Sequence, residues 1–301
     1  MSTSTATSAA HAAPAQNNRA SLGVLLILGS AVAFSTAGLF TRLIALDTWT
    51  ILVWRGLFAA AFILCCIIAR HGRGTVAAFR AIGTAGIAAS ACSAAGTICF
   101  ISALRLTSVA DVTLIFATAP FAAAAIAWLW AGERASRVTL AASLGALCGV
   151  IVIFGSAWRT GQVAGYVLAL AATVTIAATM VIIRRRNDRS FLPAACLSAF
   201  VSAIVVLPAS HPGVVGTGTL FYLALFGITQ LGLGLLLLML GARLISASQS
   251  ALIGTLEVPL APLWVWLAFG EIPSWMTFVG GAIIAVAVLS DILLNTGRQP
   301  D

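Results

Sequence analysis

The sequence predicts an all-α integral membrane protein with ten transmembrane helices in two inverted five-helix repeats. Three observations lead to this fold class. Hydrophobic residues make up 61% of the 301 residues and charged residues only 8%, whereas about a quarter of a soluble domain is charged. Apolar runs long enough to cross a bilayer recur along the chain. The second half of the chain also repeats a residue pattern of the first half.

The apolar runs set the number of spans. A hydrocarbon core about 30 Å thick requires about 20 apolar residues in each helical crossing. Runs of this length alternate with short polar segments, and they are much longer than the ~10 alternating residues of a membrane barrel strand. The predicted spans cover residues 22–44, 49–69, 81–104, 107–130, 138–157, 163–183, 191–208, 219–241, 246–269 and 275–295.

Arginine supplies all sixteen positive side chains, because the chain contains no lysine. The absence of lysine excludes enzymes that use a lysine nucleophile or Schiff base. Twelve arginines fall on one side of the predicted spans, three on the other, and Arg55 lies within a span. Since basic residues accumulate in cytoplasmic connections, this bias predicts both termini in the cytoplasm. Topology therefore accounts for the net charge of +8, and no nucleic-acid partner is expected.

The chain divides into four predicted segments. Residues 1–20 are small and polar with no hydrophobic run, which predicts a disordered cytoplasmic tail. Residues 21–157 form the first five-helix repeat and residues 158–295 the second. Residues 296–301 form a short cytoplasmic C-terminal tail.

An internal repeat links the two halves. Residues 102–136 align without a gap on residues 240–274. The composition is biased, so chance matches of alanine and leucine carry little weight, but shared Arg, Trp and Gly-Glu spacings are less easily accidental. The matched pairs are Arg105 with Arg243, Ser108 with Ser246, Trp128 with Trp266, Gly132 with Gly270, and Glu133 with Glu271.

Further spacings extend the repeat and give its orientation. Gly23–Arg42 and Gly165–Arg184 have equal lengths, each pair marking the start and end of a span. A repeat of five spans must enter the membrane from the opposite side the second time, so the halves are inverted. Inverted repeats are typical of secondary transporters. Val258 stands where the first half has Pro120, which leaves open a different kink in the two halves.

Motifs in both halves resemble those of a known family. Ala103 to Arg134 contains A-L-R-L-T-S, T-A-P and G-E-R, and Leu256 to Glu271 contains L-E-V-P and G-E. Together with the span pattern over residues 22–295, these motifs are similar to the ten-helix drug/metabolite transporter superfamily, EamA type. The resemblance implies a bacterial inner-membrane protein that exports amino acids or other small metabolites. One branch, the YddG-like exporters, moves aromatic and other amino acids.

Glu257 stands about 11 residues into the ninth predicted span, near the bilayer midplane. A charge at that depth costs several kcal/mol, so the side chain is expected to face the bundle interior. It can bind a substrate ammonium group or a coupling proton. Alternatively, it accepts hydrogen bonds from backbone amides freed by Pro259 and Pro262. Both interpretations stay open. Its helical face also carries Ser250, Ile253, Gly254, Ala261 and Trp264.

Arg55 and Asp111 lie at similar depths below the outer ends of their spans. The favoured interpretation is a structural ion pair, because an unpaired charge is costly there and arginine suits a carboxylate. The alternative is that Arg55 faces the cavity and holds a substrate carboxylate, while Asp111 orients it.

Uncharged side chains complete the candidate substrate-binding set. Gln230 lies in the middle of its span and is costly to hide, and Trp54 lies deep enough to stack on an apolar substrate. Serine and threonine in membrane helices more often serve helix packing than ligand binding. The remaining candidates are Ser93, Thr97, Thr36, Thr173 and Trp264.

These features favour a secondary active transporter that exports small metabolites, most of all aromatic or neutral amino acids, by alternating access at a midplane cavity. The expected partners are a small-molecule substrate and membrane lipid, and a two-repeat bundle can act as a monomer. We predict no catalytic residue, cofactor or metal. One alternative is a facilitative uniporter or channel. Another is a membrane-embedded lipid-modifying enzyme, which would need a cluster of acid and histidine side chains that these short loops do not offer.

Overall fold

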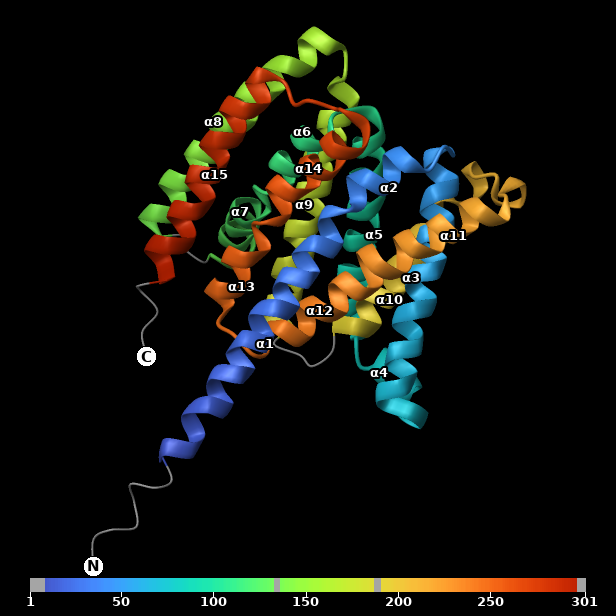
Figure 1. Ribbon diagram of the computed structural model, residues 1–301, viewed down its shortest axis with the longest axis vertical. Helices are drawn as coiled ribbons and strands as arrows, with labels where there is room; N and C mark the ends of the chain where they lie inside the picture. Colours follow the sequence, from blue (N-terminus) through green and yellow to red (C-terminus); the bar gives the residue numbers. More distant parts are fainter. Residues whose placement is uncertain (1–8, 133–135, 187–190, 297–301) are drawn as a thin grey trace, which may run out of the picture.

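The computed structural model describes residues 9–132, 136–186 and 191–296, and over these ranges the protein is all-helical (Figure 1). Ten segments are long and apolar enough to cross a membrane, which confirms the predicted number of spans. They are Ser21–Leu43, Thr48–Arg80, Gly83–Leu106, Val109–Trp130, Arg137–Gly155, Val163–Arg184, Leu192–Ala209, Thr217–Gly241, Gln249–Phe269 and Trp275–Leu294.

Helix breaks divide several of these spans into shorter helices. The first half contains α1 (Ala9–Ser35), α2 (Ala37–Leu43), α3 (Thr48–His71), α4 (Thr75–Arg80), α5 (Gly83–Leu106), α6 (Val109–Phe116), α7 (Ala119–Ala131) and α8 (Arg137–Thr160). The second half contains α9 (Val163–Arg186), α10 (Phe191–Val206), α11 (Thr217–Leu225), the π-helix η4 (Phe226–Leu233), α12 (Gly234–Gly241), α13 (Ala247–Gly254), α14 (Glu257–Phe269) and α15 (Trp275–Thr296).

Successive spans run in opposite directions, so each end of the bundle collects a fixed set of connections. We call the end where α2 meets α3 the Arg42 end, and the end where α3 finishes the Arg70 end. Helix α1 begins and α15 finishes at the Arg70 end, as Figure 1 shows. This arrangement is the one expected from an even number of crossings.

Small residues let the helices approach closely. Helix α5 lies along α9, α8 along α15, and α3 along α10 (Figure 1). At the α8–α15 crossing, a Cβ atom on Gly149 would lie 2.7 Å from the carbonyl oxygen of Gly280. A larger side chain at Gly149 would therefore separate the two helices. Close backbone approach of this kind stabilises helix pairs in lipid, where the hydrophobic effect gives no driving force between helices.

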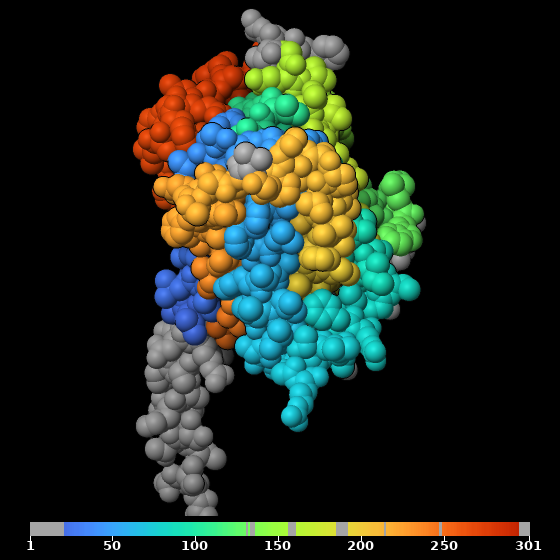
Figure 2. Space-filling view, turned by 90° about the vertical axis from the view of Figure 1, so that its right-hand side faces the viewer, coloured from blue at the N-terminus to red at the C-terminus, as the bar shows by residue number. Residues whose placement is uncertain are grey.

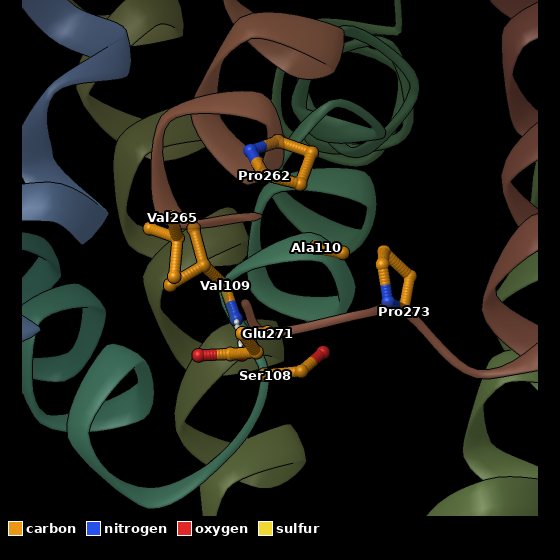
Figure 3. Close-up of a pocket in the computed structure, with 7 residues that line it drawn as sticks. All are labelled: Ser108, Val109, Ala110, Pro262, Val265, Glu271 and Pro273. Carbon is orange, nitrogen blue, oxygen red and sulfur yellow. Dashed lines mark hydrogen bonds between the residues drawn. The ribbon is translucent and has the colours of Figure 1, made fainter. Parts of the chain in front are cut away.

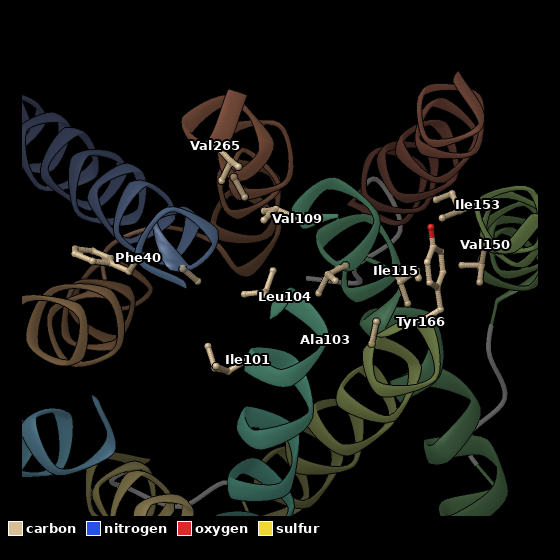
Figure 4. Packing of buried hydrophobic residues seen from close by; sticks show 14 of the residues in the cluster. Phe40, Ile101, Ala103, Leu104, Val109, Ile115, Val150, Ile153, Tyr166 and Val265 are labelled. Atoms are coloured by element: carbon tan, nitrogen blue, oxygen red, sulfur yellow. The ribbon is translucent and has the colours of Figure 1, made fainter. Parts of the chain in front are cut away.

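The main hydrophobic cluster contains residues of α5, α6, α9 and α14 and extends to α2 and α8 (Figure 4). Leu104, Val109, Ile115 and Tyr166 in this cluster are almost completely buried, and Val265 of α14 packs into it from the opposite repeat. The cluster fixes α6 and α14 against each other. These two helices carry the acidic residues Asp111 and Glu257.

The repeat predicted from the sequence is present in the helix boundaries. Helix α13 begins and ends at the residues aligned with the bounds of α6, and α14 does the same for α7. Ser108 and Ser246 each cap the first helix of the pair through the side-chain oxygen. Gly132 and Gly270 each follow the second helix with φ of 65° and 69°, a left-handed conformation that favours glycine. The exchange of Pro120 for Val258 therefore leaves the position of the break unchanged.

The prediction of a disordered tail over residues 1–20 is wrong for residues 9–20, which belong to α1. This stretch is rich in alanine, the residue with the highest helix propensity. It continues the first span beyond the bundle at the Arg70 end (Figure 1). Residues 1–8 lie outside the described part of the chain.

Candidate functional site

Among the described residues, the first, fourth and ninth spans are each broken near a threonine. Helix α1 gives way to α2 at Thr36, α6 to α7 at Thr118, and α13 to α14 at Thr255. Each threonine Oγ1 donates to the carbonyl oxygen three residues earlier, at 2.6, 2.7 and 2.6 Å respectively. The carbonyl oxygens of Ala33 and Ile115 also accept from the threonine amides at 3.3 and 3.1 Å. The hydroxyl groups therefore add a second bond at the first two breaks, and the Thr255 hydroxyl bonds the Leu252 carbonyl at the third.

Glu257 is the first residue of α14, directly after the break in the ninth span. Its side chain is half-buried, and its carboxylate makes no hydrogen bond or ion pair with any residue that the structure describes. The amides of Val258 and Leu260 donate to backbone carbonyls at 3.1 and 3.2 Å, and Pro259 has no N–H group. The interpretation that Glu257 accepts from freed backbone amides is therefore wrong, because those amides are already bonded. The positive end of the α14 dipole still favours a carboxylate at this position.

The surroundings of Glu257 combine a packed side and an open side. On the same helical face, Ala261 is buried and Trp264 donates from Nε1 to Ser35 Oγ at 2.9 Å, which joins α14 to the break between α1 and α2. Toward α13, a Cβ atom on Gly254 would meet no atom within 4 Å. Open space thus lies beside Gly254, three residues before Glu257, and Trp264 on the face of Glu257 contacts the break between α1 and α2.

Arg55 of α3 forms a second polar cluster with η4. Its Nη2 donates to Gln230 Oε1 at 2.6 Å, and its guanidinium carbon lies 4.9 Å from the ring centre of Phe226. Phe226 in turn stacks on Phe40 of α2 at 5.0 Å. Arg55 is only 3% exposed, and its Nε and Nη1 have no hydrogen-bond partner in the described chain. Part of a buried guanidinium is therefore left free to bind an acceptor.

The π-helix brings Gln230 to this cluster. In η4 the backbone of Gly227 lies so close to α3 that a Cβ atom would stand 2.5 Å from the carbonyl oxygen of Arg55. Only glycine fits this approach. Local π-helix is frequent at functional sites because it redirects side chains within a span.

The predicted ion pair between Arg55 and Asp111 is wrong. Asp111 accepts hydrogen bonds from Tyr166 Oη at 2.5 Å and from Thr277 Oγ1 at 2.6 Å. It therefore joins α6 to α9 and α15 and does not orient Arg55. Two neutral hydroxyl donors satisfy the carboxylate, while the Gln230 amide satisfies part of the guanidinium, so both charges are accommodated without pairing.

The other predicted site residues divide into free and bonded groups. Trp54 stacks on Phe58 at 5.8 Å, and its buried Nε1 has no partner among the described residues. Ser93 and Thr97 on α5 are half-buried and make no hydrogen bond within the described chain. Thr173 Oγ1 donates to the Ala169 carbonyl at 2.8 Å. Thr36 and Trp264 bond as described above.

The structure brings Arg55 and Gln230 together, and it places Trp264 on the face of Glu257. No hydrogen bond, ion pair or ring contact between described residues joins these two groups to each other. Sequence reasoning missed Phe40 and Phe226, because aromatic residues are frequent throughout such a chain. The π-helix that carries Gln230 also leaves no clear pattern in the sequence.

The Arg42 end of the bundle is fastened by charged side chains. Arg42 Nε lies 3.0 Å from Glu271 Oε2, and its Nη2 donates to the Thr107 carbonyl at 2.9 Å. Glu271 also accepts from the Val109 amide at 3.2 Å, and Figure 3 shows this bond among the residues that line a small pocket. The pair thus joins α2, the α5–α6 connection and the α14–α15 connection.

Two further residues act at the same end. Arg105 donates to the carbonyl oxygens of Thr41 and Leu46 at 2.7 and 3.0 Å, which ties α5 to the α2–α3 connection. Asp47 caps α3 by accepting from the Thr50 amide at 2.9 Å. Burial alone would raise the pKa of Asp47, but hydrogen bonds from Thr50 hold this pKa below its ordinary value.

Comparison with known proteins identifies the family. The model of the EamA-like transporter family matches residues 21–155 and 163–290. A solved structure described as "Crystal structure of protein" has a TM-score of 0.65 and 20% identity, covering 93% of this chain and 99% of its own; at that identity it shows the fold alone. A search of curated proteins gives no match. Because the family match covers most of the chain in two repeats, the protein belongs to the EamA-like transporter family, a family of membrane transporters of small molecules.

Proposed function

We propose that the protein is a secondary transporter that exports small amphipathic metabolites, with amino acids as the first candidate cargo. The observation that carries this proposal is the free carboxylate of Glu257 at a helix break, next to open space. A charge at this depth is tolerable when a cation or a proton visits it. The moving units are residues 21–157 and 158–295, and the membrane is the bacterial inner membrane with both termini in the cytoplasm.

The two polar clusters suit the two charged groups of an amino acid. The Glu257 carboxylate is the complement of an ammonium group, and the free Nε and Nη1 of Arg55 are the complement of a carboxylate. Trp54 and Phe226 supply aromatic surfaces beside Arg55. Since Arg55 is buried in this conformation, cargo reaches it only after α3 and η4 move apart.

The inverted repeat supports alternating access, because the charged residues that join the helices at one end have counterparts in the other repeat. The counterparts of Arg42, Arg105 and Glu271 are Arg184, Arg243 and Glu133. By inversion these belong to the Arg70 end. There Arg243 is exposed and makes no hydrogen bond with a described residue, and Glu133 lies outside the described residues. We propose that the Arg42 end faces the outside of the cell and is closed in this conformation. When the Arg42 end opens, Arg184 and Glu133 pair and close the Arg70 end.

The test is transport by the purified full chain in liposomes, measured against a panel of radiolabelled amino acids. We expect uptake of at least one panel member and a loss of about tenfold or more for Glu257→Gln, which keeps size but cannot carry charge. Asp47→Asn is the matched control, because asparagine caps a helix as well as aspartate does.

The transport assay tests the role of Glu257, the amino-acid cargo and the coupling to a gradient separately. Transport by the wild type that Glu257→Gln leaves unchanged would remove Glu257 from the site. Failure of the wild type to move any panel member would overturn the amino-acid assignment. Accumulation against a gradient that collapses with a protonophore supports secondary active transport, whereas equilibration alone would indicate a facilitative uniporter.

A further inference from the structure

A groove of about 380 Å³ runs along the outer side of α3, away from Glu257 and Arg55. Leu57, Ala61 and Leu64 of α3 form one wall, Leu197 and Phe200 of α10 form the other, and Phe79 of α4 lies at one end. Figure 2 shows the face of the molecule on which α3 and α10 lie side by side. Small residues create the groove, and Cys196 Sγ donates to the Ala60 carbonyl at 3.4 Å on its floor.

The groove opens toward lipid. Its residues on α3 and α10 belong to the spans Thr48–Arg80 and Leu192–Ala209. Leu64 and Phe200 on opposite walls are 36% and 48% exposed, so the groove is accessible from the side of the bundle. Every side chain that lines it is apolar or a thiol, which excludes a polar cargo. An acyl chain is the occupant that such a surface accepts at this depth.

Three arginines gather at the end of the groove where Phe79 lies. Arg70 lies six residues after Leu64, one residue before the end of α3. The following turn contains Arg73, and Arg80 follows Phe79 directly. Arg70, Arg73 and Arg80 are exposed, and none makes a side-chain hydrogen bond or ion pair with a described residue. Unpaired guanidinium groups at a membrane surface attract anionic lipid headgroups and can bind phosphate oxygens in pairs.

We propose that this groove binds an anionic phospholipid, with one acyl chain against α3 and α10 and the phosphate on Arg70, Arg73 and Arg80. The apolar walls give affinity for any bilayer lipid, and the arginines give preference for negative charge. The lipid occupies the leaflet at the Arg70 end. This site is independent of cargo binding, so its failure would leave the proposed transport function untouched.

Native mass spectrometry of the purified full chain in detergent tests this site by titration with lipids that have the same acyl chains. We expect phosphatidylglycerol to bind one site about tenfold or more tightly than phosphatidylcholine. The triple variant R70Q/R73Q/R80Q is expected to bring the two lipids to equal affinity. The matched control is R185Q/R186Q/R189Q, which removes three arginines from a different connection on the same predicted side of the membrane. This control is expected to keep the preference for phosphatidylglycerol.

A second variant tests the groove itself. Ala61 is exposed on the groove wall, so Ala61→Trp fills the space without entering the packed interior and is expected to weaken both lipids several-fold. Equal binding of the two lipids by the wild type would overturn the proposal. Equal losses from the two arginine triples would show non-specific surface charge, and unchanged binding by Ala61→Trp would place the acyl chain elsewhere; either result also refutes the site.

Discussion

Arg42 and Glu271 form an ion pair in which Nε and Oε2 are 3.0 Å apart, although the two residues stand 229 positions apart in the chain. The pair connects the first repeat to the second at the Arg42 end. Its side chains are 24% and 28% exposed, so solvent screens it less than an ordinary surface pair. This pair and the bonds of Arg105 hold together the connections at the end that we propose is closed.

Glu271→Gln is expected to loosen the Arg42 end. The substitution keeps the size of the side chain and one acceptor oxygen for the Val109 amide, but it removes the charge that Arg42 binds. Hydrogen bonds to charged groups contribute about 1.5–3 kcal/mol, so amide hydrogen exchange over residues 104–109 is expected to speed up roughly tenfold or more. Mass-spectrometric exchange measures this directly. Exchange that stays at the wild-type rate in this segment would show that the pair does not hold the end closed.

Gln230→Leu is expected to destabilise the protein strongly. It removes the hydrogen bond to Arg55 and leaves a nearly fully buried guanidinium with only the Phe226 ring as a partner. Breaking one partner of a buried polar pair costs about 1–3 kcal/mol, and more for charged groups. Thermal unfolding in detergent measures the loss, with Gln249→Leu at an exposed helix cap as the control. Equal melting temperatures for Gln230→Leu and wild type would contradict the role of this bond.

Asp111 and Tyr166 are expected to be energetically coupled. The short bond from Tyr166 Oη to Asp111 links α6 to α9, so Asp111→Asn and Tyr166→Phe each remove part of one interaction. Residues in direct contact show interaction energies of about 0.5–3 kcal/mol in double-mutant cycles. Unfolding free energies of the two single variants and the double variant give this value. Strict additivity would mean that the bond contributes nothing to stability.

Thr255→Val is expected to cost about 0.6 kcal/mol and at most about 1.7 kcal/mol, the average and the maximum for side-chain hydrogen bonds between membrane helices. The hydroxyl satisfies the Leu252 carbonyl at the break before Glu257, and valine leaves that acceptor free at equal volume. Thr255→Ser keeps the donor and is the matched control. Equal losses of stability in the two variants would show that side-chain packing, and not the hydroxyl, matters at this position.

The sequence predicts the spans and the repeat well, because both depend on apolar run length and on chain order. The break between α13 and α14 lies at the position aligned with the α6–α7 break, and the Arg and Gly-Glu spacings mark it in the printed residues. The sequence also identifies Glu257 as a candidate, because an acidic residue within an apolar run is apparent from the residue order alone.

The hydrogen-bond partners of the buried charged side chains could not be predicted in the same way. Arg55 and Asp111 match in depth, but depth does not determine which helix faces which, and Arg55 faces Gln230 instead. Asp111 finds Tyr166, a residue that reads as a hydrophobic position of the sixth span. The direction of each side chain depends on helix packing and on the π-helix η4, which follow from tertiary contacts and not from residue order.

If the two repeats alternate as proposed, the space beside Glu257 is open to water from one side at a time. Gly254→Cys in a chain whose native cysteines are replaced by serine places a thiol in the open space next to the intact carboxylate. A membrane-impermeant maleimide applied to sealed vesicles of known orientation reports which side reaches it. We expect labelling from the Arg70 side alone, and labelling from both sides once Glu271→Gln is added. A thiol that reacts from neither side, or from both sides regardless of Glu271, would contradict it.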